Sequence, residues 1–209
     1  MNRLNNLLDL FIHQAEAVSA IVTRVASARE VLDYAVNLCE RKEACQLLVA
    51  GCEAPLSVPA EALCETKQTK VIAAPGLPPD QLATLNDLCQ ARGIQCTTDH
   101  LRDHLAGIDI GLTYADFGIA DTGTLVIDSS SEETRLATMI SEIHIAVLPL
   151  SRLRASSYAL ETELQGAMAK APNYMAFITG ASRTADIERV LALGVHGPLE
   201  LHILILEET

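Results

Sequence analysis

Residues 70–98, KVIAAPGLPPDQLATLNDLCQARGIQCTT, contain a short apolar run, then an amphipathic segment, then a second short apolar run. Pro79 stands where a helix can begin and Gly93 where it can end, because Pro fits the first helical turn and Gly the position after the last. The stretch therefore predicts a strand, a helix and a strand in succession. Strands joined through a helix run parallel, so we expect a parallel sheet covered by helices.

The same alternation continues toward the C-terminus. Apolar runs predict strands at residues 46–51, 143–150, 174–180 and 199–207, and helical patterns lie at residues 132–140, 156–170 and 184–193. Residues 108–130 differ, because glycines interrupt a stretch rich in Thr, Ile and Val. That pattern predicts two or three strands with tight turns, which allows an antiparallel excursion on the sheet.

The N-terminal segment has helical periodicity. Apolar residues recur at three- to four-residue spacing from Leu4 to Ala15, Val18 to Val25 continue the stripe, and a second stripe covers residues 31–39. We therefore divide the chain into an N-terminal helical extension, residues 1–42, and an α/β domain, residues 43–209. Core packing is the preferred interpretation of both stripes, and docking of a partner on the leading helix is the alternative.

Composition limits the function classes. The chain has 209 residues, of which 49% are hydrophobic and 20% charged, as in ordinary soluble globular proteins. Its net charge of −12 repels polyphosphates and anionic lipid surfaces, and no Lys/Arg stripe occurs, so neither nucleic acid nor a membrane is an expected partner. The N-terminus carries no targeting pattern, and the longest apolar runs have strand length, so we expect a cytoplasmic protein.

The cysteines and histidines do not predict a metal centre. No C-x-x-C pair occurs, and scattered cysteines in a cytoplasmic chain are mostly small buried residues, so we expect neither a metal nor an iron–sulfur cluster in this chain. His100 and His104 have the i, i+4 spacing of a zinc site on a helix, but the sequence indicates no third ligand. The six cysteines all lie in the first half of the chain: Cys39, Cys45, Cys52, Cys64, Cys89 and Cys96.

The segment ITGASRTADIE, residues 178–188, is the first candidate ligand site. A predicted strand ends before Gly180 and a helix begins near Thr184, where free backbone N–H groups and the helix dipole favour an anion. Arg183 offers a planar fork for a carboxylate or phosphate, and Ser182 and Thr184 offer hydroxyl donors. The alternative is local structure: the hydroxyls only cap the helix, and Arg183 pairs with Asp186 or Glu188.

Two further turns carry candidate groups. In GVHGP, His196 lies between two glycines and can act as a proton donor, an orienting group or a structural residue. In ADTGT, Thr122 and Thr124 flank Gly123 and present hydroxyls. Ligands of open α/β sheets collect beyond the carboxyl ends of strands, so His196 is expected near Arg183 only if the last strand runs antiparallel to the strand before Gly180.

Three segments in order, GIADTGTLVI (118–127), HIAVLPLSRL (144–153) and ITGASRTADIERVLALGVHGPLELHILIL (178–206), resemble the LUD-domain family, in its lactate utilization protein C type. The resemblance implies a three-layer α/β/α sandwich of the NagB/RpiA/CoA-transferase-like kind, here with N-terminal helices. It also implies a role in oxidation of L-lactate to pyruvate beside iron–sulfur partner proteins. The chain departs from the family at Ala181, where Pro is usual, and at Ser141 and Glu142, where a Pro-rich turn is usual.

Two function classes follow. In the first, the chain is a non-redox subunit of a lactate-oxidising system that binds a small carboxylate or phosphate ligand and assembles with iron–sulfur proteins or with itself. In the second, it is a free-standing enzyme acting on a sugar phosphate or an acyl-CoA. Fold alone does not decide between them, and no residue is assigned a catalytic role. The expected ligand-binding residues are Gly180, Ser182, Arg183, Thr184, Asp186, His196, Thr122, Gly123 and Thr124.

Overall fold

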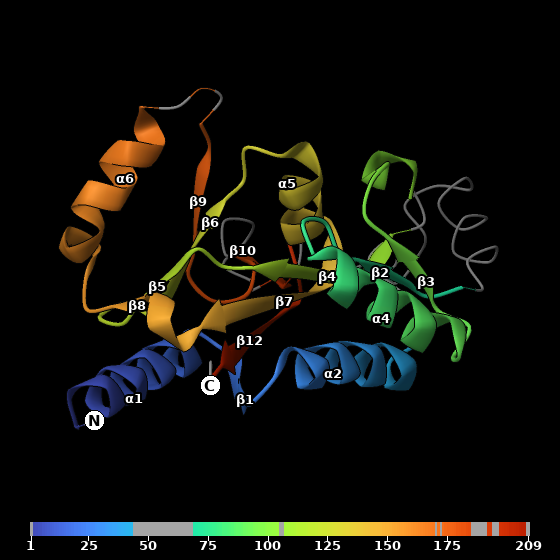
Figure 1. The fold of residues 1–209 in the computed structure, drawn as a ribbon, viewed down its shortest axis with the longest axis horizontal. Coiled ribbons are helices and arrows are strands. Elements are labelled where there is room, and N and C mark those ends of the chain that lie inside the picture. Colours follow the sequence, from blue (N-terminus) through green and yellow to red (C-terminus); the bar gives the residue numbers. More distant parts are fainter. Residues whose placement is uncertain are drawn as a thin grey trace.

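A six-stranded parallel sheet forms the centre of the molecule (Figure 1). The computed structural model describes residues 2–43, 69–104, 107–169, 171, 173–184, 192–193 and 197–207. Every neighbouring pair in the order β1-β12-β7-β4-β2-β3 runs parallel, which confirms the predicted α/β class. The strands are β1 (Ala20–Val25), β2 (Val71–Ala73), β3 (Gln95–Thr97), β4 (Ile108–Tyr114), β7 (Ser141–Pro149) and β12 (Glu200–Leu206).

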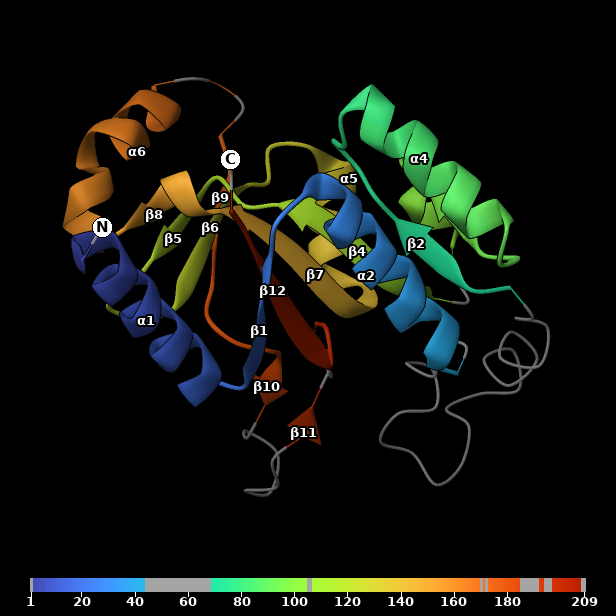
Figure 2. The ribbon, with the colours of Figure 1, turned by 60° about the horizontal axis from the view of Figure 1, so that its bottom comes forward.

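Layers cover both faces of this sheet (Figure 2). Helices α2 (Ala28–Arg41) and α4 (Pro79–Gln90) pack on one face through an aliphatic core that includes Leu32, Leu85 and Ile145. Helices α1 (Asn2–Ala17) and α5 (Glu132–Met139) lie on the other face, where Phe11 and Ile203 belong to a second core cluster. The arrangement is the three-layer sandwich that the sequence predicts.

A second sheet lies on the side of the central sheet that α1 and α5 cover. Its four strands have the order β8-β5-β6-β9, and β6 runs antiparallel to both β5 and β9. Residues 108–130 contain the predicted strands and an antiparallel pair, but β5 and β6 form that pair in this second sheet, and only β4 belongs to the central sheet. These strands are β5 (Phe117–Ile119), β6 (Thr124–Asp128), β8 (Leu153–Arg154) and β9 (Met175–Ile178).

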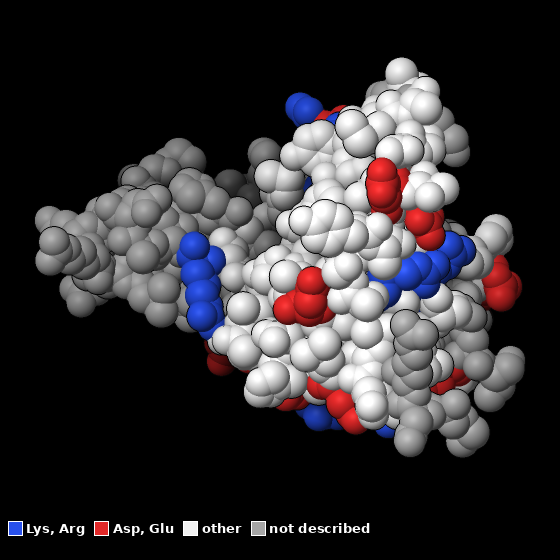
Figure 3. Space-filling view, turned by 90° about the vertical axis from the view of Figure 1, so that its left-hand side faces the viewer, with Lys and Arg blue, Asp and Glu red and all other residues white. Residues whose placement is uncertain are grey.

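Helix α6 (Glu161–Met168) covers the outer side of the second sheet, preceded by a 3₁₀ turn, Ser157–Leu160. Leu160 and Leu164 pack there against Phe117 and Val126. Figure 3 shows the side of the molecule that carries α1 and α6, where acidic and basic groups form separate small clusters on a largely uncharged surface. The acidic excess of the chain is thus not gathered into one patch on this side. None of the described helices is long and apolar enough to cross a bilayer.

The predicted continuation of the first helix through residues 18–25 is wrong. Helix α1 ends at Ala17, Ser19 adopts a left-handed φ of 67°, and β1 then pairs in parallel with β12. The β-branched side chains of residues 21–23 favour this strand, and the pairing supplies partners for its backbone. Residues 1–42 therefore form a helix, a strand and a helix rather than a helical extension, and the strand belongs to the central sheet.

The apolar stripe of α1 forms part of the core. Leu8, Phe11 and Ala15 are buried beneath the second sheet, while Leu4 and Leu10 remain exposed. This packing follows the preferred interpretation of the stripe and leaves its central residues inaccessible to a partner.

The predicted helix over residues 184–193 is wrong at both ends. Strand β10 (Arg183–Thr184) pairs antiparallel with β11 (Ala192–Leu193). The strand predicted at residues 46–51 and the cysteines Cys45, Cys52 and Cys64 lie outside the described residues. Cys39 and Cys89 are buried as expected, and a hydrogen bond with Cys89 lowers the pKa of the half-buried Cys96 thiol.

Candidate functional site

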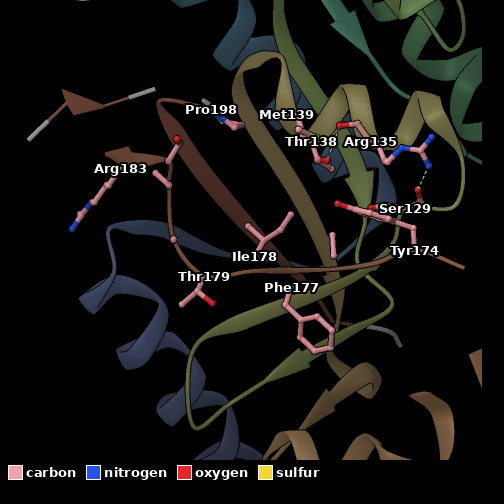
Figure 4. A pocket seen from close by; sticks show the side chains of 15 residues that line it. Ser129, Arg135, Thr138, Met139, Tyr174, Phe177, Ile178, Thr179, Arg183 and Pro198 are labelled. Carbon is pink, nitrogen blue, oxygen red and sulfur yellow. Dashed lines mark hydrogen bonds between the residues drawn. The ribbon is translucent and has the colours of Figure 1, made fainter. Parts of the chain in front are cut away.

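A pocket of about 410 Å³ lies between α5, β9 and the loop that precedes β12 (Figure 4). It is placed where the second sheet meets the amino ends of β7 and β12, since Met139 precedes β7 and Pro198 precedes β12. A crevice at carboxyl ends of strands is the expectation, and the pocket touches those of β6 and β9 in the second sheet, since Ser129 and Thr179 directly follow these strands. The described lining residues are Ser129, Arg135, Thr138, Met139, Tyr174, Ala176, Phe177, Ile178, Thr179, Gly180, Ala181, Ser182, Arg183, Gly197 and Pro198.

Helix α5 forms one wall. Arg135, Thr138 and Met139 have i, i+3 and i+4 spacing, which places them on one face of the helix. Arg135 Nη1 donates to the carbonyl oxygens of Ser129 at 2.6 Å and Ser130 at 3.0 Å. The Arg135 guanidinium also lies over the ring of Tyr174, 5.7 Å from its centroid. The turn after β6 therefore fixes a cation beside an aromatic ring.

Strand β9 forms the opposite wall, and its side chains alternate. In Figure 4, Ile178 and Tyr174 lie on the side of α5, whereas Phe177 and Thr179 point the other way. Thr179 Oγ1 is 2.8 Å from Thr124 Oγ1, which is 2.8 Å from Thr122 Oγ1. We expected Thr122 and Thr124 to form a wall of the site. The structure places them behind β9 instead, and neither is among the described lining residues.

Two glycines hold these turns against the end of α1. Gly180 has a φ of 74°, and a Cβ there would lie 2.2 Å from the Val18 carbonyl oxygen. Gly123 has a φ of 63°, and a Cβ there would lie 2.3 Å from the Ala15 backbone nitrogen. A side chain at either position would be strained and would clash with backbone. Gly123 is thus required for packing on α1.

The loop after β9 meets the loop before β12, as the sequence predicts. The Ser182 N–H donates to the Pro198 carbonyl at 3.0 Å, and a Cβ at Gly197 would lie only 3.2 Å from Ser182 Oγ. Strands β9 and β12 belong to different sheets, so these loops meet without any pairing between the two strands. His196 and Asp186 lie outside the described residues, and so does the side chain of Thr184.

Arg183 is exposed at the opposite end of the pocket from Arg135 (Figure 4). Its guanidinium points away from Thr138 and Met139 in that view. Among the described residues, no hydrogen bond or ion pair holds it in place. An exposed Arg of this length can turn toward a ligand seated beside Ser182.

The pocket differs in charge from the rest of the chain. Two arginines and five hydroxyl-bearing residues occur in its described lining, and no Asp or Glu does, although the chain has 27 acidic residues. Guanidinium and hydroxyl groups donate hydrogen bonds to carboxylates and phosphates. This arrangement suits an anionic group. Sequence patterns did not predict five of the lining residues, although the spacing of the three on α5 marks one helical face: Ser129, Arg135, Thr138, Met139 and Tyr174.

His100 and His104 do not share a helical face. They flank a 3₁₀ turn, Leu101–Asp103, and His100 has a left-handed φ of 55°. No group of three His, Cys, Asp or Glu residues suited to a metal occurs in the described part of the chain.

His144 is a buried histidine on the sheet face that α5 covers. Its Nε2 lies 2.9 Å from Thr113 Oγ1, and Gly111, its register partner, packs directly against α5. Complete burial lowers the pKa of His144 from 6.5 to about 4, because the charged imidazolium is poorly solvated there. The ring is therefore neutral at pH 7.

We expect the free energy of unfolding to fall as the pH is lowered from 7.5 to 5.5. Below pH 6.5 the unfolded chain binds a proton at His144 that the folded chain does not, down to a pH of about 4. His144 thereby lowers the free energy of unfolding by roughly 1.4 kcal/mol for each pH unit below 6.5. Urea unfolding of the wild type and His144→Gln at several pH values measures it. Equal pH slopes for the two proteins would contradict this assignment.

Comparisons with known proteins identify the family. A profile of the LUD domain matches residues 8–206. The chain belongs to the LUD domain family. It is 37% identical over 103 residues to lactate utilization protein C of Halalkalibacterium halodurans, a match that covers 48% of this chain and 45% of that protein. It is 32% identical over 102 residues to lactate utilization protein C of Shouchella clausii, covering 48% and 44%. The matched region thus spans about half the length of these curated relatives.

The fold of this LUD domain also has a solved counterpart. The crystal structure of a DUF162 family protein from Deinococcus radiodurans has a TM-score of 0.57 and 17% identity, and the match covers 97% of this chain and 98% of that one. At this identity the likeness concerns the fold. Ser141 and Glu142 have structural roles in this chain, because Ser141 Oγ donates to the Ala137 carbonyl at 2.7 Å and Glu142 accepts from Lys42.

Proposed function

We propose that this protein acts in lactate utilization as a non-redox subunit that binds an anionic group of a small molecule in the pocket between α5 and β9. The observation that carries the proposal is the charge of the described lining, which includes Arg135 and Arg183 but no carboxylate. An acidic side chain would repel a carboxylate or phosphate, and its absence from this lining favours such ligands. The names of the relatives supply the biological setting.

The ligand contacts follow from the loop after β9. The backbone beyond Gly180 and the Ser182 hydroxyl lie beside the pocket, and the exposed Arg183 can close over an anion bound there. The Arg135 guanidinium is already held by two carbonyl oxygens, so it supplies a fixed positive field at the other end. The redox centres are proposed to belong to iron–sulfur partner proteins, because the cysteines of this chain are scattered and lack the spacing of a cluster site.

The test is a calorimetric titration of the wild type and Arg183→Ala with L-lactate, pyruvate and ribose 5-phosphate. We expect at least one of these anions to bind, and we expect Arg183→Ala to weaken it ten- to a hundredfold. A charge-assisted hydrogen bond contributes about 1.5–3 kcal/mol, which corresponds to that range. The melting temperature should change little, because the side chain is exposed.

A matched control is Arg29→Ala, which removes an exposed arginine from α2, on the opposite face of the central sheet. It should leave the affinity unchanged. A lower melting temperature with unchanged affinity in Arg183→Ala would instead assign Arg183 a structural ion pair.

A further inference from the structure

The middle of the pocket is apolar. Between the two arginines the lining includes Met139, Tyr174 and Ile178, and Pro198 closes the side near β12 (Figure 4). Tyr174 is 55% exposed and Met139 is 54% exposed, although both are large apolar side chains. Large side chains that line a pocket and remain half exposed are typical of surfaces that a ligand covers.

The pocket is also larger than a three-carbon acid requires. Even at about 30 Å³ for each non-hydrogen atom, the volume of one water molecule in the liquid, lactate or pyruvate would occupy no more than about 180 Å³. That is less than half of the 410 Å³ present. Pockets of roughly 300–1,000 Å³ ordinarily enclose molecules of several rings or groups.

From these observations, and resting on the anion site proposed above, we infer that the pocket binds a molecule in which an anionic group is joined to a planar ring, as in a nucleoside monophosphate. The ring lies between Tyr174, which directly precedes β9, and Met139 on α5, and the anionic group lies at Ser182 and Arg183. Three-carbon acids then fill only the anionic end.

The geometry around Tyr174 supports a ring at this place. The Arg135 guanidinium lies 5.7 Å from the ring centroid, and more than half of the residue is still exposed to solvent. Aromatic rings pack favourably on one another in offset or edge-to-face arrangements, and a thioether such as that of Met139 makes favourable contacts with a ring edge. Arg135, Thr138 and Met139 share the α5 face opposite Tyr174, and Tyr174 directly precedes β9, so the ring position lies between a helix and the start of a strand.

The test uses three probes that separate the two parts of the ligand: adenosine 5′-monophosphate, ribose 5-phosphate without the ring, and adenosine without the phosphate. We expect the complete nucleotide to bind at least tenfold more tightly than either fragment. Tyr174→Ala and Met139→Ala should each weaken the nucleotide about tenfold and leave ribose 5-phosphate within twofold. Arg183→Ala should weaken both phosphates. Tyr158→Ala is the matched control, because Tyr158 is 88% exposed on the 3₁₀ turn before α6 and is not among the described pocket residues.

Two results would overturn the inference while leaving the proposed anion site intact: equal affinities for the nucleotide and ribose 5-phosphate, or a nucleotide affinity that Tyr174→Ala does not change. Failure of every anionic probe to bind the wild type would overturn both proposals. Circular dichroism and melting curves of each variant show whether a lost affinity reflects a lost fold.

Discussion

Asp109→Asn is expected to lower the free energy of unfolding by about 3–5 kcal/mol, the range for breaking a buried ion pair at one partner. Asp109 is completely buried at the amino end of β4, where its carboxylate accepts from Lys42 Nζ at 2.8 Å and from the Val71 N–H at 2.7 Å. Lys42 also donates to Glu142 at 3.0 Å. An asparagine offers one oxygen to the two donors and no charge to the lysine.

The pH dependence that Lys42 contributes to stability lies above the physiological range. Burial alone would lower the pKa of Lys42, but the hydrogen bonds and charges of Asp109 and Glu142 outweigh it and raise that pKa above its ordinary value. A folded pKa above the unfolded one gives stability that is present at neutral pH and is lost only as the pH rises past the range of a lysine. Unfolding can therefore be measured at pH 7 with Lys42 charged.

Urea unfolding and melting curves measure the expected loss, which corresponds to a fall of about 10 °C in the melting temperature at about 2–4 °C per kcal/mol. Asp33→Asn is the control, because Asp33 pairs with Arg29 on the exposed side of α2 and should change stability by about 0.5 kcal/mol or less. Combining Asp109→Asn with Lys42→Met should cost less than the sum of the two single changes. Strict additivity would contradict direct coupling between the two groups.

Regular periodicity predicted most of the central sheet. The apolar runs at residues 143–150 and 199–207 correspond to β7 and β12. Pro79 and Gly93 mark the two ends of the region that contains α4. The prediction of a helix over residues 18–25 was wrong because apolar side chains at positions 18, 21, 22 and 25 fit a helical stripe as well as a strand. The partner that decides between them is β12, which lies at the other end of the chain. Such long-range pairing leaves no local signal.

The candidate site was only partly predictable for the same reason. The loop after β9 and the loop before β12 were expected to meet, and they do. The wall formed by α5 was not predicted because nothing in the spacing of residues 129–139 indicates that they face β9. The cluster of Lys42, Asp109 and Glu142 was missed likewise, since Lys42 lies 67 and 100 positions from its two partners. These contacts arise from the order of strands in the sheet.

Gly111→Ala is expected to disturb stability and the pocket together, because Gly111 is the point where α5 rests on the central sheet. A Cβ at this position would lie 2.0 Å from the Ala137 carbonyl oxygen and 2.8 Å from Ser141 Oγ. The first contact is with backbone, so the helix itself must move rather than a flexible side chain. Overpacking of this kind costs about 1–3 kcal/mol, and the clash with backbone places this variant at the upper end.

Because α5 carries Arg135, Thr138 and Met139, its displacement should also weaken whichever anionic probe the wild type binds, by about tenfold. Gly166→Ala in α6 is the matched change, since a Cβ there meets nothing within 4 Å and alanine favours a helix by roughly 0.5–1 kcal/mol. It should raise the melting temperature slightly and leave binding unchanged. A stable Gly111→Ala protein with full affinity would mean that α5 can shift on the sheet without moving the pocket, and the wall formed by α5 would then not be part of the binding site.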